Sequence, residues 1–170
     1  RTYRFFEAGM DERARARRKL ELDLRQAIVD GDLEVHFQPI VDIESGRINC
    51  CEALLRWQHS ERGMIPSTEF IPIAEETGLI NQLGQWVLST ACTEAVNWPD
   101  HVRVAVNVSP VQFRSKTLAL NVAATLAASG LAASRLELEI TEAVLIRDDE
   151  AALDVLHQLR KVGVRVALDD

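Results

Sequence analysis

The fold is decided by residues 102–170, which read VRVAVNVSPVQFRSKTLALNVAATLAASGLAASRLELEITEAVLIRDDEAALDVLHQLRKVGVRVALDD. Runs with the alternating pattern of strands are separated there by runs of good helix formers, in the order 102–108, 116–129, 136–141, 149–162 and 164–170. The two predicted helices stop at Gly130 and Gly163, because glycine takes the left-handed conformation that ends a helix. Strands and helices that alternate over short links predict a parallel α/β arrangement.

The residues before this region predict a hairpin followed by two more helices. Residues 33–43 and 47–57 are strand-like, and the sequence ESG at 44–46 is typical of a turn between antiparallel strands. Helices are predicted over 67–77 and 81–98.

A further helix is predicted over 11–29, where charges of both signs mix with good helix formers. Leu20, Leu24 and Ile28 recur every four residues and form a narrow apolar stripe. Gly31 ends this helix. The helix either packs at the edge of the domain or connects it to a preceding domain.

The alternation of side chains places polar residues on one face of the predicted sheet. In the strand 102–108 the valines share one face, and Asn107 lies on the other. The next two strands add Glu139 and Asp169 to this polar face near their C-terminal ends, and the preceding strand adds Glu52. Barrels and doubly wound sheets both bind ligands at the C-terminal ends of parallel strands, so this placement fits either fold.

The candidate ligands at this pole are Glu52, Asn107, Glu139 and Asp169, with the neighbouring Asp170. Carboxylates brought together repel each other and are costly to bury unless cations neutralise them. Every candidate ligand atom is an oxygen, which favours Mg²⁺ or Mn²⁺. Tandem aspartates can serve two metals, and two metals about 4 Å apart stabilise the attacking and leaving oxygens of phosphoester hydrolysis.

The charge distribution excludes one class of partner. Residues 1–25 carry eight Lys and Arg and five Asp and Glu, so residues 26–170 hold 19 − 8 = 11 basic and 26 − 5 = 21 acidic side chains. An acidic body of this kind lacks the basic footprint that binds nucleic-acid polymers.

Cysteine usage and hydropathy predict a cytoplasmic domain. Cys50, Cys51 and Cys92 have no metal-ligand spacing and are interpreted as buried thiols in a reducing compartment. No apolar run reaches the length of about 18 to 20 residues that spans a bilayer. A membrane tether elsewhere in a parent protein stays open.

Five motifs resemble those of the EAL domain family and follow the family's order. They are FQPI at 37–40, EALLRW at 52–57, NVS at 107–109, EITE at 139–142 and LDD at 168–170. The second is similar to the signature that gives the family its name. One hexapeptide is a modest signal, whereas five motifs in order over residues 33–170 are a strong one. Residues 1–6 resemble the last strand of a GGDEF domain, the usual upstream neighbour of EAL domains.

The resemblance implies a phosphodiesterase that hydrolyses cyclic di-GMP to the linear dinucleotide pGpG with two Mg²⁺ or Mn²⁺ ions. Its metal ligands would be Glu52, Asn107, Glu139 and Asp169, and Asp170 would serve the second metal.

The resemblance also implies roles for four further residues. Gln38 and Arg56 would contact the cyclic dinucleotide, Arg56 as a cation near a phosphate. Leu54 would shape the substrate pocket. Glu142 would brace the loop that follows Asp170 and so support the catalytic site.

The family's fold is a (β/α)₈ TIM-like barrel whose first strand runs antiparallel to the rest, in agreement with the predicted hairpin. Only about five of the eight strands are expected before residue 170. The expected domains are the end of a GGDEF-like domain at 1–10, a connecting helix at 11–30 and the N-terminal part of an EAL domain at 31–170. The expected partners are a second copy of the complete protein and an upstream GGDEF or sensor domain in cis.

The family's downstream Lys, Glu and Gln are absent from these residues. We therefore expect residues 1–170 alone to be inactive and marginally stable or prone to aggregation, because the last strand exposes an unpaired edge. A soluble, monomeric and cooperatively unfolding segment would contradict this expectation. The rival hypothesis is an EAL-like domain that senses cyclic di-GMP or docks a protein without turnover.

Each motif also has a purely structural interpretation. Glu52 and Arg56 fit an ion pair within one strand. Residues 107–110 fit a turn with a helix cap. The acidic residues of 139–142 fit a solvated surface, and an isolated pair at 169–170 fits an exposed strand end.

Overall fold

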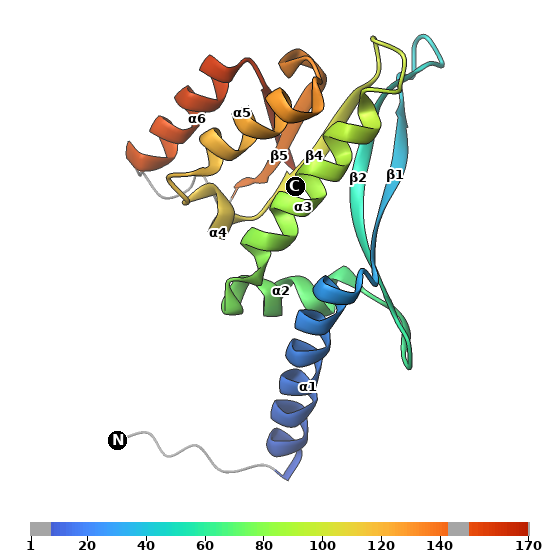
Figure 1. The fold of residues 1–170 in the computed structure, drawn as a ribbon, viewed down its shortest axis with the longest axis vertical. Coiled ribbons are helices and arrows are strands. Elements are labelled where there is room, and N and C mark those ends of the chain that lie inside the picture. The colour runs from blue at the N-terminus through green and yellow to red at the C-terminus, as the bar shows by residue number, and fades with distance from the viewer. Residues whose placement is uncertain (1–7, 143–149, 170) are drawn as a thin grey trace.

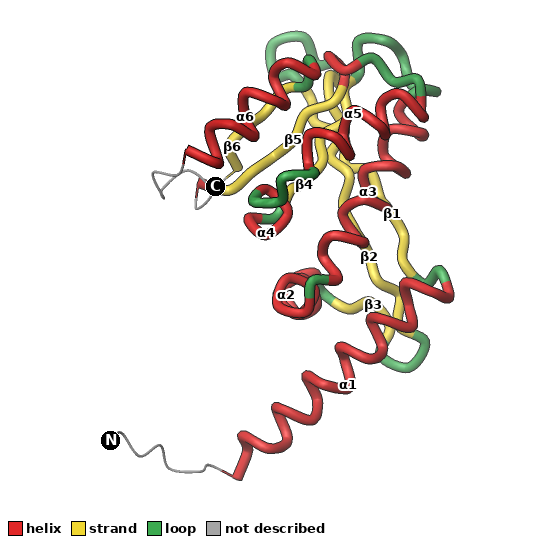
Figure 2. The backbone as a smooth tube through the Cα atoms, turned by 60° about the vertical axis from the view of Figure 1, so that its left-hand side comes forward, coloured by secondary structure: helices red, strands yellow, loops and turns green. Residues whose placement is uncertain are grey.

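The structure is a computed structural model that describes residues 8–142 and 150–169 (Figures 1 and 2). In chain order its elements are α1 (Ala8–Asp30), β1 (Leu33–Val41), β2 (Ile48–His59), β3 (Gly63–Ile65), α2 (Ser67–Thr77), α3 (Leu79–Ala95), β4 (Arg103–Val108), α4 (Pro110–Phe113), α5 (Leu118–Ser129), the 3-10 turn η1 (Ala133–Arg135), β5 (Leu136–Thr141), α6 (Glu150–Val162) and β6 (Arg165–Asp169). Every helix and strand predicted between residues 11 and 169 is present, with some shifted ends. Residues 1–6, which resemble the last strand of a GGDEF domain, lie outside the described residues. None of the described helices is long and apolar enough to cross a membrane.

The strands form one mixed sheet in the order β1-β2-β4-β5-β6, with β3 paired to β2. β1 and β3 run antiparallel to β2, whereas β2, β4, β5 and β6 run parallel to one another. The predicted hairpin and the predicted parallel α/β arrangement are therefore confirmed. Helices α3, α5 and α6 lie over one face of this sheet (Figure 1).

The larger of two cores lies between the sheet and α3, α5 and α6. Alternate residues of β4 and β5 enter it, and β4 contributes Val104, Val106 and Val108, none more than 6% exposed. We call this side of the sheet the helix face. The opposite side, which bears Glu52 and Asn107, is called the site face. The assignment of the valines to the helix-covered side is thus confirmed.

The smaller core joins α1 to β2 and α2. Leu20, Leu24 and Ala27 of α1 are buried there. Trp57 and Phe70 are buried in the same core, and their rings meet edge-on with centroids 5.6 Å apart. These aromatic side chains give α1 a large apolar surface to pack against.

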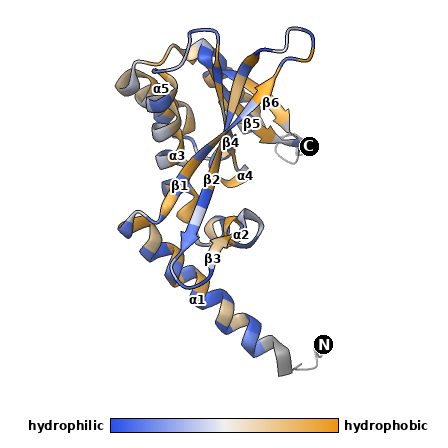
Figure 3. Ribbon diagram, turned by 90° about the vertical axis from the view of Figure 1, so that its right-hand side faces the viewer, coloured by the Kyte–Doolittle hydropathy of each residue, from blue (hydrophilic) through white to orange (hydrophobic). Residues whose placement is uncertain are grey.

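Only the C-terminal half of α1 takes part in this packing. Residues 11–19 are all exposed, and Figure 3 shows hydrophilic and hydrophobic residues mixed along the helix. Ile28, predicted to continue the stripe of Leu20 and Leu24, is only partly buried. The helical repeat of about 3.6 residues turns Ala27 toward the core instead.

Two short elements escape the sequence patterns. β3 has three residues and α4 has four, which is too short for either the strand or the helix period to be recognised. β3 pairs with the end of β2, from Trp57 to His59. α4 follows β4 directly and becomes important at the functional site.

The three cysteines are free thiols. Burial raises the pKa of Cys50 and of Cys92 to about 11, because a charged thiolate is poorly solvated there. Cys51 is half-buried, and burial raises its pKa as well. The interpretation as buried thiols is confirmed for Cys50 and Cys92.

Replacing Leu24 by Ala is expected to lower the free energy of unfolding of the complete protein by about 2–5 kcal/mol, because a buried side chain leaves a cavity. Leu24 is 0% exposed, whereas Leu22 on the same helix is 55% exposed. Leu22→Ala is therefore the matched control, with an expected change within about 0.5 kcal/mol. Urea unfolding followed by circular dichroism measures both variants. Equal effects would contradict the packing of α1 described above.

Alkylation by iodoacetamide at pH 8 is expected to be far slower at Cys50 and Cys92 in the native protein than in urea. A raised pKa leaves less thiolate at a given pH, and a thiol of pKa about 11 is roughly 0.1% thiolate at pH 8. Mass spectrometry of the labelled peptides gives the rate at each cysteine. Native labelling at the urea rate would show that these thiols are accessible and normally acidic.

Candidate functional site

β1 and β2 bring the predicted substrate residues to the site face. Gln38 lies opposite Glu52 in the antiparallel ladder. Leu54 and Arg56 follow Glu52 at alternate positions of β2 and therefore lie on its side of the sheet. Ala53, between Glu52 and Leu54, lies on the helix face and is 3% exposed. The regular pleat of β2 thus aligns three candidate residues.

A hydrogen bond joins two of the predicted metal ligands. Asn107 Nδ2 donates to Glu52 Oε1 over 2.7 Å. Glu52 is level with Ala105 of the neighbouring strand, and Asn107 stands two residues further along on the same face. The contact is therefore a diagonal one across the β2–β4 ladder. With Nδ2 used in this way, the amide oxygen is the atom of Asn107 suited to ligate a cation.

The next two strands continue the line of predicted ligands. Glu139 is half-buried and level with Asn107 in the β4–β5 ladder. Asp169 stands two residues beyond Ala167, which is level with Glu139. Adjacent strands lie about 4.8 Å apart, so these positions step across the sheet at short intervals. Only the backbone of Asp169 is described, and Asp170 lies outside the described residues.

Glu142 is exposed and directly follows β5. The loop that it is predicted to brace would come after Asp170, so this role stays a prediction.

Arg56 Nη1 donates to the backbone oxygen of Leu55 over 3.0 Å. In the described part of the chain it forms no ion pair with Glu52, so the interpretation of these two residues as an intra-strand ion pair is wrong.

The chain that follows Asn107 is held by a reciprocal cap. Ser109 is the N-cap of α4, and its hydroxyl accepts from the backbone N–H of Gln112 over 3.3 Å. The side-chain oxygen of Gln112 accepts from the backbone N–H of Ser109 over 3.1 Å. The turn with a helix cap, weighed as an alternative to a ligand role, is therefore present beside the Asn107–Glu52 contact. The two interpretations are compatible.

A partly buried ion pair lies nearer the N-terminal ends of β4 and β5. Arg103 Nη1 and Glu137 Oε2 are 2.6 Å apart, with side chains 25% and 17% exposed. Arg103 neutralises Glu137, which lies further than Glu139 from the C-terminal end of β5. Glu52 and Glu139 lie nearer the C-terminal ends of the parallel strands than this pair does.

A cavity of about 300 Å³ opens beside the predicted site residues. Its walls include Leu54, Arg56, Glu75, Asn107 and Thr141, which come from β2, α2, β4 and β5. Arg56 places a cation in this wall, and Glu75 places an acidic side chain there. The cavity thus combines apolar surface with a few charged groups, as small-molecule sites do.

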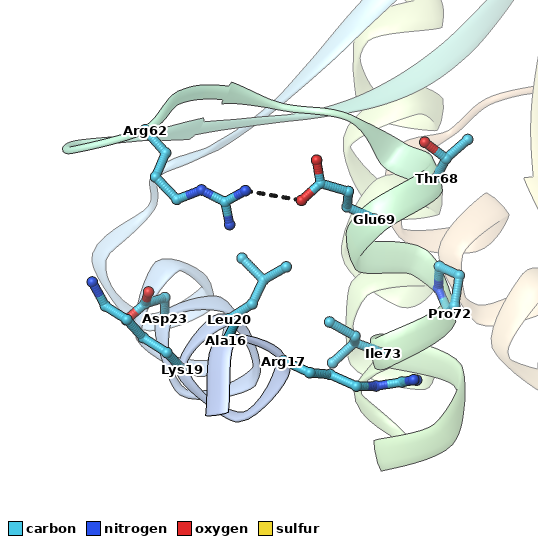
Figure 4. Close-up of a pocket in the computed structure, with 10 residues that line it drawn as sticks. All are labelled: Ala16, Arg17, Lys19, Leu20, Asp23, Arg62, Thr68, Glu69, Pro72 and Ile73. Atoms are coloured by element: carbon cyan, nitrogen blue, oxygen red, sulfur yellow. Dashed lines mark hydrogen bonds and ion pairs between the residues drawn. The ribbon is translucent and has the colours of Figure 1, made fainter. Parts of the chain in front are cut away.

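A larger cavity of about 520 Å³ lies between α1 and α2, away from these strand ends (Figure 4). Its charged groups are already paired, since Arg62 contacts Glu69 over 2.9 Å and Arg17 contacts Glu76 over 2.5 Å. None of the predicted site residues lines it. The chemistry therefore favours the smaller cavity as the candidate site.

The described residues include no cluster of three or more His, Cys, Asp or Glu side chains that could hold a metal ion. The predicted ligand set has an amide, Asn107, and two aspartates whose side chains are not described. The donors that are described fit Mg²⁺ or Mn²⁺ in kind, because they are carboxylate and amide oxygens. Glu52 and Asn107 also fit in position, being already in contact.

Two residues that line the candidate site, Gln112 and Glu75, were not among the residues predicted from the sequence. Gln112 stands three residues after Ser109, and the pattern S-x-x-Q is the signature of the reciprocal cap observed here. Glu75 has no such signal, because only the tertiary packing of α2 brings it to the cavity.

A family model described as EAL domain matches residues 21–170.

Two curated relatives illustrate the similarity of the sequence. The chain is 51% identical over 165 residues to "Uncharacterized protein y4lL" of Sinorhizobium fredii, a match that covers 97% of this chain and 20% of that protein. It is 42% identical over 172 residues to "Bifunctional diguanylate cyclase/cyclic di-GMP phosphodiesterase MucR" of Pseudomonas aeruginosa, with 99% and 25% covered. The chain thus spans a quarter or less of the length of these relatives.

A solved structure has the same arrangement of elements. The phosphodiesterase PaMucR in complex with c-di-GMP superposes with a TM-score of 0.86 at 42% sequence identity. The match covers 89% of this chain and 63% of that chain. The mixed α/β fold with its parallel-rich sheet is therefore shared with a solved phosphodiesterase domain.

Proposed function

The chain belongs to the EAL domain family, and from this premise we propose that its complete domain hydrolyses cyclic di-GMP. One phosphodiester bond is cleaved, giving linear pGpG, with Mg²⁺ or Mn²⁺ as cofactor. The observation that carries the proposal is the 2.7 Å contact between Asn107 and Glu52 on the site face. Gln38 lies opposite Glu52, and Glu139 is level with Asn107, so the candidate groups converge.

The complete domain is proposed to be a (β/α)₈ barrel whose first strand is antiparallel. The sheet order supports this, because β1 and β6 are its outer strands and further strands can pair with both. The antiparallel β1–β2 pair beside a parallel series also matches this arrangement. In such a barrel the site face lines the lumen, and the active site lies at the C-terminal ends of the parallel strands.

Two metal ions are proposed to be held by Glu52, Asn107, Glu139, Asp169 and Asp170. When bound, such ions supply an activated water and stabilise charge on the leaving oxygen. The protein contributes fixed oxygen positions. The Asn107 amide orients the Glu52 carboxylate through a hydrogen bond to one of its two oxygens.

The substrate is proposed to lie across the site face, in contact with the 300 Å³ cavity. The Arg56 guanidinium, in the wall of that cavity, is suited to pair with a phosphate of the cyclic dinucleotide. Gln38 presents an amide opposite Glu52, where it can donate to or accept from the substrate. Leu54 supplies apolar surface for a base or ribose.

Glu142 is proposed to act through a loop that follows Asp170, by fixing its position near the metals. A second copy of the complete protein and an upstream GGDEF or sensor domain are proposed partners. The short share of the curated relatives that this chain spans supports a multidomain parent.

Replacing Glu52 by Gln is expected to abolish most turnover of cyclic di-GMP by the complete protein, because the amide cannot neutralise a cation. Loss of a residue that only supports a metal ligand lowers activity by about 10- to 100-fold, so loss of a ligand is expected to lower kcat/KM by more. Chromatography of linear pGpG formed with Mn²⁺ or Mg²⁺ is the measurement. Glu94→Gln, at an exposed position of α3, is the matched control and should retain full activity.

The outcomes separate an enzyme from a sensor. Product from the wild type and from Glu94→Gln, with little from Glu52→Gln, supports the phosphodiesterase. A folded wild type that binds cyclic di-GMP without forming product in either metal would replace this proposal by the sensor hypothesis.

A further inference from the structure

We propose that Gly84 and Gln112 are positioning residues of the metal site. Gly84 of α3 leaves the space in which the Gln112 side chain lies, and Gln112 fixes the chain that follows Asn107. The inference rests on the proposed function, since Asn107 is a proposed metal ligand. It adds two residues that none of the motifs of the chain includes.

The link between β4 and α4 is the single residue Ser109. Val108 alone separates Asn107 from Ser109, and it is 6% exposed. Ser109 takes an extended conformation, with φ of −69° and ψ of 155°, and begins α4. The direction in which β4 leaves the sheet therefore depends on whether Ser109 stays in this capping conformation.

α4 cannot hold this conformation by itself. It has four residues, and a helix of this length is unstable without tertiary support because nucleation is costly. Two anchors are visible: Phe113 is 1% exposed within the larger core, and Gln112 is 9% exposed. Gln112 provides the second anchor through its bond from the Ser109 N–H, 3.1 Å long.

The place of the Gln112 side chain depends on the absence of a side chain at Gly84. An ideal Cβ at this position would lie 1.8 Å from Gln112 Nε2 and 2.6 Å from Gln112 Cδ. Both distances are far below van der Waals contact, so alanine would force the carboxamide to move. The carboxamide cannot move without weakening its bond from Ser109, because the same group carries the accepting oxygen.

Gln112 also lines two neighbouring cavities. Gly84, Asn107 and Gln112 line the proposed substrate cavity of about 300 Å³. The same three residues line a neighbouring cavity of about 280 Å³, which extends toward α5. A displaced Gln112 side chain would therefore change the wall of the substrate cavity as well as the direction of Asn107.

The test measures Mn²⁺ affinity in the complete protein by electron paramagnetic resonance of the free ion, with folding checked by circular dichroism. The variants are Gly84→Ala, Gln112→Ala and the double variant. Ser89→Ala, at an exposed position of the same helix, is the matched control. Residues that position a metal ligand typically change metal affinity by about 10- to 100-fold.

Each single variant is expected to weaken Mn²⁺ binding by about 10-fold or more, and Ser89→Ala is expected to leave it unchanged. The double variant should bind no more weakly than Gln112→Ala. Once the carboxamide is gone, the methyl group that Gly84→Ala adds has nothing to displace. Non-additivity is expected because the two residues act through one contact. The loss of Mn²⁺ affinity in variants with the circular dichroism of the wild type is the result that a merely structural role would not produce.

Two results would overturn the inference. One is unchanged Mn²⁺ affinity in both single variants while the wild type binds Mn²⁺, which leaves the proposed function intact. The other is losses that add up in the double variant, which would mean that the two residues act separately. If Gly84→Ala fails to fold, Gln112→Ala, which creates no overlap, still decides the question. A wild type that binds no Mn²⁺ would instead overturn the proposed metal site itself.

Discussion

The alternation of side chains along β2 is the constraint on which the rest of the structure depends. β2 pairs with β1, β3 and β4, and its residues Ala53 and Trp57 enter the two cores. Glu52 and Arg56, each directly before one of these two residues, are thereby turned to the site face. A slip of one residue would exchange the two sets, placing a carboxylate in an apolar core and the indole in solvent. Burial of Ala53 and Trp57 fixes the register of β2, and this register also determines which way the proposed catalytic groups of β2 point.

Repulsion between the carboxylates of the site face is a second constraint on the structure. The chain has a net charge of −7, and its parallel strands bring carboxylates together on one face. Arg103 neutralises Glu137 within the sheet. The neutral amide of Asn107 stands between Glu52 and Glu139, because Asn107 donates to Glu52 and is level with Glu139. The Asn107 amide separates the negative charges of Glu52 and Glu139 and orients the Glu52 carboxylate. The proposed ligand oxygens can therefore be in place before a cation binds.

Periodicity and turn chemistry were sufficient to predict most of this architecture. The face of each strand followed from alternation, since Val104, Val106 and Val108 are buried whereas Asn107 is exposed. Patterns of local sequence could not predict β3, because this short strand is defined by its pairing with the end of β2, from Trp57 to His59. They could not supply the Gly84–Gln112 contact either, because it joins residues that only the packing of α3 on α4 brings together. The predicted roles of Asp169 and Asp170 remain predictions, because their side chains are not described.

The helix α1 belongs to two environments at once. Its first half is exposed, while Leu24 and Asp23 in the second half contact the domain. Asp23 Oδ2 accepts from His59 Nε2 over 3.2 Å, because the other ring nitrogen of His59 accepts from the backbone N–H of Glu61. His59 is the last residue of β2, and this strand runs without interruption back to Glu52. The second half of α1 is therefore joined through packed side chains and the Asp23–His59 hydrogen bond to the strand that carries Glu52.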